Sequence, residues 1–174
     1  MRRVKVVGNA GAGKTTFARK LAARLGVPHR ELDEVFWAPN WQQRDTNEAL
    51  ANLQAWLAEP GADGWVLCGN WNNKLGALLD DADTIVWLDY SRWVVMPRII
   101  WRTLARIISR RDIWHGNRER PGNIFKRDPN QNIMRWAWTH HNAYRERYLK
   151  LAAEDARVVR LASPKAARLW LKSV

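Results

Sequence analysis

The sequence is poor in cysteine and in long apolar runs, and both shortages restrict what the protein can be. Cys68 is the single cysteine among 174 residues, which excludes an intrachain disulfide and leads us to expect a reducing, cytoplasmic location. No apolar run is long enough to span a bilayer, and an apolar strand starting near residue 3 leaves no room for a signal peptide. His140 and His141 are adjacent, so in a helix they point about 100° apart and cannot bind a metal as a pair. We therefore expect a soluble protein with no membrane partner and no zinc site.

Acidic residues are also scarce, with 17 of them against 29 lysines and arginines, which gives a net charge of +12. Half of this surplus lies between residues 92 and 120, where eight arginines accompany two acids, Asp112 and Glu119. Residues 90–111 contain no acid at all. Such a charge attracts polyanions in general, and by itself it does not indicate whether the partner is nucleic acid, a nucleotide or anionic lipid.

The remaining composition, 47% hydrophobic and 26% charged, is that of one globular domain with a sizeable core. Short apolar segments alternate with longer helical ones. We expect strands over residues 4–7, 31–32, 65–68, 84–88 and 157–161. Helices are expected over 16–25, from Asp45 or Thr46 to about 59, over 74–79, 91–108 and 130–153, and from Pro164, with a bend or restart at Pro97. This alternation predicts an α/β fold with a parallel sheet covered on both faces, whose ligands bind beyond the carboxyl ends of the strands.

The first strand is followed directly by a complete phosphate-binding P-loop, residues 8–15. Its glycines allow successive backbone N–H groups to turn toward an anion, and the helix that follows adds a favourable dipole. Lys14 is expected to reach the β- and γ-phosphates, and the Thr15 hydroxyl to bind Mg²⁺. The nucleotide-binding residues expected here are Gly8, Asn9, Ala10, Gly11, Ala12, Gly13, Lys14, Thr15 and Thr16.

Two carboxylates follow apolar strands. Asp33 is expected to close the second strand, where it would orient an acceptor hydroxyl and take its proton, or hold a water on Mg²⁺. A helix cap or a solvated loop acid is the alternative for Asp33. Asp89 ends the fourth strand, where P-loop proteins place a carboxylate that supports Mg²⁺, although a helix cap explains it equally well.

The third strand is followed by Gly69, Asn70 and Trp71. The glycine permits close approach of a ligand, the amide can bind a polar group, and the indole offers a flat wall. A simple turn would explain the same residues. Together with Asp33 and Trp37, these three residues form the expected acceptor site.

Arg98, Arg102, Arg106 and Arg110 recur every four residues and should share one helical face. Without nearby acids they repel one another, so an external phosphate is the simplest partner; a solvated basic face, or pairing with acids elsewhere in the fold, is the alternative. Residues 109–130 combine turn-forming and charged residues between two long helices, which predicts a lid that excludes water. Arg102 is expected to contact the nucleotide, and Arg106 and Arg110 the transferring group.

With these motifs the chain resembles small P-loop kinases related to adenylate kinase, most closely the family named DNA topology modulation proteins. The resemblance covers the P-loop, the segments 32–37, 39–41, 69–71 and 87–89, the arginine-rich helix and residues 160–164. It implies a five-stranded parallel sheet, ATP with Mg²⁺, a closing lid, Asp33 facing the acceptor, and Ser163 and Pro164 bordering the adenine. Two departures stand out: Cys68 where the family usually has an acid, and Trp71 where it usually has tyrosine.

The sequence thus predicts an ATP- and Mg²⁺-dependent phosphotransferase that acts on a small molecule or a nucleotide. The alternatives are a P-loop NTPase that binds nucleic acid, suggested by the charge, and a non-catalytic nucleotide sensor. No nucleic-acid motif is recognisable, and the basic charge is concentrated where a kinase lid would lie.

Overall fold

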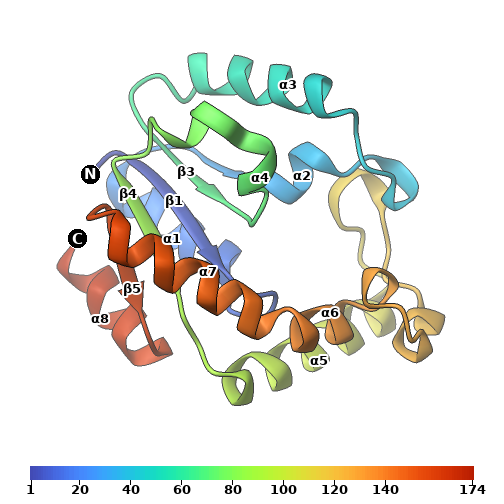
Figure 1. Cartoon of the computed structure of the whole chain (residues 1–174). Coiled ribbons are helices and arrows are strands. Elements are labelled where there is room, and N and C mark those ends of the chain that lie inside the picture. The colour runs from blue at the N-terminus through green and yellow to red at the C-terminus, as the bar shows by residue number, and fades with distance from the viewer.

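Five parallel strands form the centre of the protein. The computed structural model describes residues 1–174, except for the side chains of Ala77 and Leu79. The strands are β1 (Arg3–Gly8), β2 (His29–Glu31), β3 (Trp65–Cys68), β4 (Thr84–Leu88) and β5 (Val158–Leu161). They form one sheet in the order β2-β3-β1-β4-β5, and every pairing is parallel (Figure 1). The predicted α/β architecture with a five-stranded parallel sheet is therefore confirmed.

Helices cover the sheet and extend beyond its carboxyl edge. The helices are α1 (Lys14–Leu25), α2 (Leu32–Phe36), α3 (Thr46–Ala58), α4 (Asn72–Leu75), α5 (Arg92–Ser109), α6 (Ile133–Thr139), α7 (His141–Glu154) and α8 (Pro164–Ser173). Short 3-10 turns are η1 (Pro39–Trp41), η2 (Gly76–Leu79), η3 (Trp114–Gly116), η4 (Pro121–Phe125) and η5 (Pro129–Gln131). Across the described residues, no helix is both long and apolar enough to cross a bilayer.

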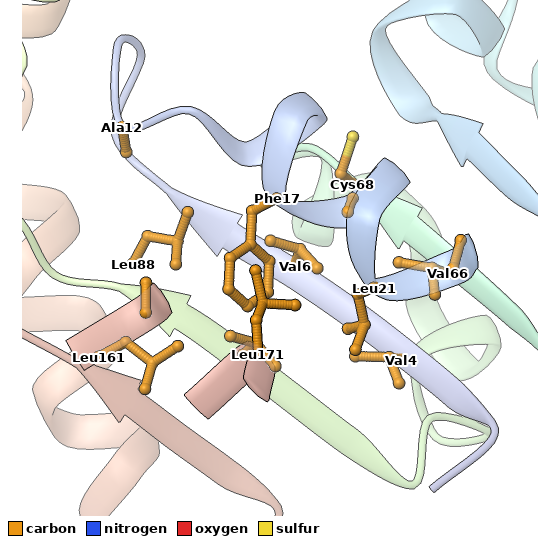
Figure 2. Close-up of a cluster of buried hydrophobic side chains, with 14 of the residues drawn as sticks. Val4, Val6, Ala12, Phe17, Leu21, Val66, Cys68, Leu88, Leu161 and Leu171 are labelled. Carbon is orange, nitrogen blue, oxygen red and sulfur yellow. The ribbon is translucent and has the colours of Figure 1, made fainter. Parts of the chain in front are cut away.

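Alternating side chains of the strands build a core on each face of the sheet. On one face, Val4 and Val6 of β1 pack with Phe17 and Leu21 of α1 and Leu171 of α8 (Figure 2). The other face carries two clusters, one under α2 and α3 and one under α7. Strand β3 is buried along its whole length and has apolar residues on both sides, as expected when helices cover both faces.

Four details differ from the sequence prediction. The second strand ends at Glu31, because Leu32 already begins α2, so Asp33 lies in a short helix rather than at a strand end. Helix α5 is continuous through Pro97. The helix expected over 130–153 is two helices, α6 and α7, which meet at His140. Arg110 lies just beyond the end of α5, in the left-handed conformation with φ 47°.

Candidate functional site

The glycine-rich loop connects β1 to α1 at the carboxyl edge of the sheet. Gly11 has φ +86°, and a Cβ there would lie 2.8 Å from the carbonyl oxygen of Val95, so only glycine fits the close approach to α5. Gly13, with φ +88°, precedes the first residue of α1. The first N–H groups of a helix have no partner within it, so the start of α1 offers donors to an anion at this loop.

Lys14 folds back over the loop. Its ammonium Nζ donates to the carbonyl oxygens of Gly8, at 2.8 Å, and Asn9, at 3.1 Å. Burial lowers the pKa of Lys14, and Asp33 is the neighbouring charge that most opposes this shift. The lysine and the carboxylate predicted for one site are therefore electrostatic neighbours in the fold.

Two asparagines hold the loop in place. Asn9 Nδ2 donates to the carbonyl oxygen of Ala137 at 2.8 Å, and Asn9 Oδ1 accepts from the N–H of Ala10 at 2.8 Å. Asn70 Nδ2 donates to the carbonyl oxygen of Gly8 at 2.8 Å, and Asn70 Oδ1 accepts from the Gly8 N–H at 3.3 Å. The amide of Asn70, expected to bind a substrate, is thus engaged by the loop itself. Gly69 makes the preceding turn, and its N–H donates to Val6 at 3.2 Å.

Glu31 is the hydrogen-bond partner of Thr15, the expected Mg²⁺ ligand. The Thr15 hydroxyl donates to Glu31 Oε2 at 3.0 Å, and Arg19 Nη2 donates to Glu31 Oε1 at 2.6 Å. Glu31 is 8% exposed, at the end of β2. The thiol of Cys68 lies 3.9 Å from the Thr15 hydroxyl, and burial raises its pKa to about 12, so this thiol is neutral. Sequence analysis missed Glu31, although a carboxylate at a strand end beside the P-loop threonine was the available signal.

Asp33 is held by the aromatic residues of the expected acceptor site. Trp71 Nε1 donates to Asp33 Oδ1 at 2.7 Å, and the Trp71 ring stacks on Phe36 with ring centres 4.6 Å apart. Trp37 meets Trp71 edge to face at 5.7 Å and Trp41 at 5.9 Å. The structure therefore brings Asp33, Trp37 and Trp71 together as predicted, with one carboxylate oxygen fixed by the indole.

Arg102, on helix α5, is an electrostatic neighbour of both Lys14 and Asp33. Its Nε is buried and has no hydrogen-bond partner among the residues that the structure describes. Burial lowers the pKa of Arg102 to about 10, and the charges acting on it include Arg106, Glu119 and Asp33. Arg106 forms an ion pair with Glu119 at 3.6 Å. Arg110, exposed beyond the helix end, shares no helical face with them, which corrects the predicted row of four arginines.

A cavity of about 390 Å³ opens beside the loop, between α1, α5 and α8. Gly11, Gly13 and Thr16 line one side of it, and Tyr90 and Arg98 line another. The remaining wall includes Arg102, Pro164 and Arg168. Ser163 caps α8 by accepting from the N–H of Ala166 at 3.1 Å, so its hydroxyl serves the helix. Ala12 also lines this cavity, so six of the expected nucleotide-binding residues (Gly11, Ala12, Gly13, Thr16, Arg102 and Pro164) border it, whereas Gly8, Asn9, Ala10, Lys14, Thr15 and Ser163 do not.

Asp89 has different partners from those expected. Its carboxylate, only 4% exposed, accepts from Arg145 Nε at 3.2 Å and from Arg160 Nη2 at 2.7 Å. Both oxygens are engaged by arginines of α7 and β5, so the arrangement gives no support to a metal role for Asp89. The helix cap considered as its alternative is also absent, since Ser91 occupies that position. Among the described residues, no group of three or more His, Cys, Asp or Glu side chains could hold a metal ion alone.

The segment expected to form a lid packs on residues 34–41. Asn117 Oδ1 accepts from the N–H of Trp41 at 2.8 Å, and Asn117 Nδ2 donates to the carbonyl oxygen of Ala38 at 2.9 Å. His115 Nε2 lies 2.8 Å from the carbonyl oxygen of Glu34. In Figure 1 this segment, coloured yellow to orange, lies beside α2 and η1, across from the sheet. It thus covers the aromatic side of the site.

Sequence analysis also missed Lys5, in the middle of β1. Its side chain is fully buried, and its Nζ has no hydrogen-bond partner among the residues described. Burial lowers the pKa of Lys5 to about 7, against the opposing effect of the Asp33 carboxylate. A lysine among valines in a strand pattern was the visible signal.

In comparisons with known proteins, no protein-family model matches the chain, and no curated protein matches it significantly.

Proposed function

We propose that this protein is a phosphotransferase of the P-loop NTPase fold, which binds ATP with Mg²⁺ and phosphorylates a small molecule or a nucleotide. The observation that carries the proposal is the buried, unpartnered Nε of Arg102 near Lys14 and Asp33. Arg102 also borders the cavity, where an anion could accept from its guanidinium, and phosphate suits these planar donors.

The loop and the cavity support a nucleoside triphosphate as that anion. The cavity volume of about 390 Å³ falls in the range of small-molecule sites, roughly 300–1,000 Å³. The phosphates would lie on the loop amides and Lys14, and the nucleoside would lie toward Tyr90 and Pro164. Arg98 and Arg168 add positive charge to the same wall. In this arrangement Lys14 exchanges its two carbonyl partners for phosphate oxygens, which are the stronger acceptors.

The residues present also fit a magnesium ion that is shared with the nucleotide. Thr15 supplies a hydroxyl, and Glu31 lies in hydrogen-bond contact with it and can hold a coordinated water. When bound, Mg²⁺ neutralises charge on the phosphate oxygens. Since the protein offers few ligands of its own, most of the coordination would come from phosphate and water, as is usual for this ion.

On the other side of the loop, Asp33 is the group placed to act on the acceptor. The hydrogen bond from Trp71 fixes its orientation, and Trp37 and Trp71 supply apolar walls. Asp33 would orient the acceptor hydroxyl and take its proton, while Arg102 stabilises the charge on the transferring group. The lid contacts of Asn117 would keep water out of this space, which protects ATP from hydrolysis.

The test is acceptor-dependent release of ADP, screened first with nucleoside monophosphates and nucleosides. With an active acceptor, Asp33→Asn should lower kcat by roughly 10²–10⁴ and change ATP affinity little, since it removes a base and keeps the shape. Asp63→Asn, at an exposed position, is the matched control and should leave the rate unchanged. Full activity of Asp33→Asn would contradict the role of Asp33, and no ADP release with any acceptor would favour the sensor alternative.

A further inference from the structure

One face of α5 is apolar and open to solvent. Trp93 is 84% exposed, Trp101 75% and Ile108 82%, while Ile100 and Leu104 are 40% and 38% exposed. At 100° per residue, these side chains and Pro97 fall within an arc of roughly 100° and extend over about 22 Å of helix. We call this set the α5 stripe: Trp93, Pro97, Ile100, Trp101, Leu104 and Ile108.

The α5 stripe is not the side by which the helix packs on the protein. The inward side of α5 carries Val95, Ile99 and Thr103, which are all buried. The helix is thus apolar on two sides, and only one of them is covered. A contiguous apolar surface of this kind on a soluble protein marks a site of interaction.

The charges near the α5 stripe are positive, and among the residues that the structure describes they have no ion-pair partner. Arg110 and Arg111 are exposed, and residues 90–111 contain no acid. The acids that flank this segment are already engaged. Asp89 binds two arginines, and Asp112 pairs with Arg118.

The acids further along the lid are engaged as well. Glu119 pairs with Arg106 at 3.6 Å. Asp128 Oδ1 accepts from the N–H of Asn130 at 2.9 Å, at the start of η5. Apart from Arg106, the arginines of α5 and of its carboxyl end therefore have no ion-pair partner among the residues that the structure describes.

These features select among the possible partners. A second copy docked stripe to stripe would bring two acid-free, arginine-bearing helices together, which like-charge repulsion opposes. Nucleic acid would satisfy the arginines but would leave a row of tryptophan, isoleucine and leucine side chains without an apolar partner. A bilayer with anionic headgroups satisfies both features, because tryptophan and aliphatic side chains enter the headgroup region while arginines meet lipid phosphates.

We infer that the α5 stripe docks this protein on the surface of an anionic membrane, with α5 lying in the plane of the interface. This inference modifies the expectation of no membrane partner: no described helix crosses a bilayer, but one can lie on it. Docking leaves the opposite face of α5, with Arg102, turned toward the candidate site. The inference is independent of the proposed function and stands whether or not ATP is bound.

Co-sedimentation of the full chain with lipid vesicles tests this docking. One set of vesicles contains phosphatidylcholine alone, and the other contains phosphatidylglycerol as well. We expect binding to the anionic vesicles that weakens as salt is added, and at least about tenfold weaker binding to the neutral ones. The double variant Trp93→Ser, Trp101→Ser should lower the partition coefficient on anionic vesicles by at least about tenfold, since each indole buries a large apolar area.

Leu169→Ser is the control, because Leu169 is an apolar residue, 58% exposed, that lies on α8 and not on α5. It should bind vesicles as the unchanged protein does, and an unaltered melting temperature of each variant shows that the fold is intact. Equal binding by the double variant and the unchanged protein would overturn the inference, as would no binding to anionic vesicles. Light scattering that shows a dimer, broken by the double variant, would assign the α5 stripe to a second copy instead. If the protein also binds duplex DNA, and the double variant weakens that binding as much as it weakens vesicle binding, the membrane assignment would likewise be overturned.

Discussion

Replacing Lys5 by methionine removes a buried amino group from the middle of β1 and nearly preserves the shape of the side chain. Lys5 is paired in register with Leu67 of β3 and Ile85 of β4, so its surroundings are the centre of the sheet. Its Nζ has no hydrogen-bond partner among the described residues. The charged form of this lysine is therefore poorly stabilised, and burial lowers the pKa of Lys5 from 10.5 to about 7.

The sign of the pH dependence follows from proton binding. Between pH 7 and pH 10.5 the unfolded chain holds a proton on Lys5 that the folded protein has released, so stability rises with pH in this window. Below pH 7 the full cost of burying the ammonium is present, and at about 1.4 kcal/mol per pKa unit it amounts to roughly 5 kcal/mol. Lys5→Met should accordingly stabilise the fold by up to this amount near pH 6, and the gain should shrink toward zero near pH 10.5.

Urea denaturation of both proteins at several pH values measures this difference directly, since titration of all other groups cancels in the comparison. Lys172→Met, in the last turn of α8, is the control and should give no pH-dependent difference. A gain in stability that is the same at every pH would refute the lowered pKa of Lys5. A loss of stability at every pH would show that the Lys5 amine has a favourable partner in the folded protein.

Three further substitutions test the contacts that hold the elements around the site. Arg145→Met and Arg160→Met should each lower the free energy of unfolding by about 1 kcal/mol. The double variant should lower it by about 3–5 kcal/mol, because it removes both cations that contact the buried Asp89. Strictly additive effects in urea denaturation would contradict this coupling. Asn117→Ala removes the hydrogen bonds that join the lid to Trp41 and should make the lid segment markedly more sensitive to limited proteolysis, with about 1–3 kcal/mol lost locally. Unchanged cleavage rates would mean that other contacts keep the lid in place.

Local patterns predicted most of the fold, because they depend on near neighbours in the chain. The apolar runs gave β3 and β4 with the bounds that the structure shows, and Asp45 caps α3 as one of the two residues proposed. The boundary at Leu32 was wrong because its apolar side chain belongs equally to a strand and to the buried side of α2. The break at His140 leaves no strong signal, since neither glycine nor proline marks it.

The sequence predicted which site residues lie together where they belong to one short motif. It did not predict contacts between segments that are far apart in the chain. The glycine-rich loop, Lys14 and Thr15 follow from spacing alone. The partners of Asp89 come from β5 and α7, more than 50 residues along the chain, and no local pattern specifies them. The same holds for the contact between Trp71 and Asp33, 38 residues apart. Arg102 could be placed on a helical face, but its burial depends on how α5 packs.

The most direct test of the proposed function is a calorimetric titration of the protein with ATP in the presence of Mg²⁺. The account predicts one binding site per chain and no measurable binding by Lys14→Met, which loses the cation over the loop. Lys150→Met, which alters an exposed ion pair on α7, should bind as the unchanged protein does. Absence of heat for ATP and GTP with the folded protein, or equal affinity in Lys14→Met, would contradict the claim that this loop binds a polyphosphate.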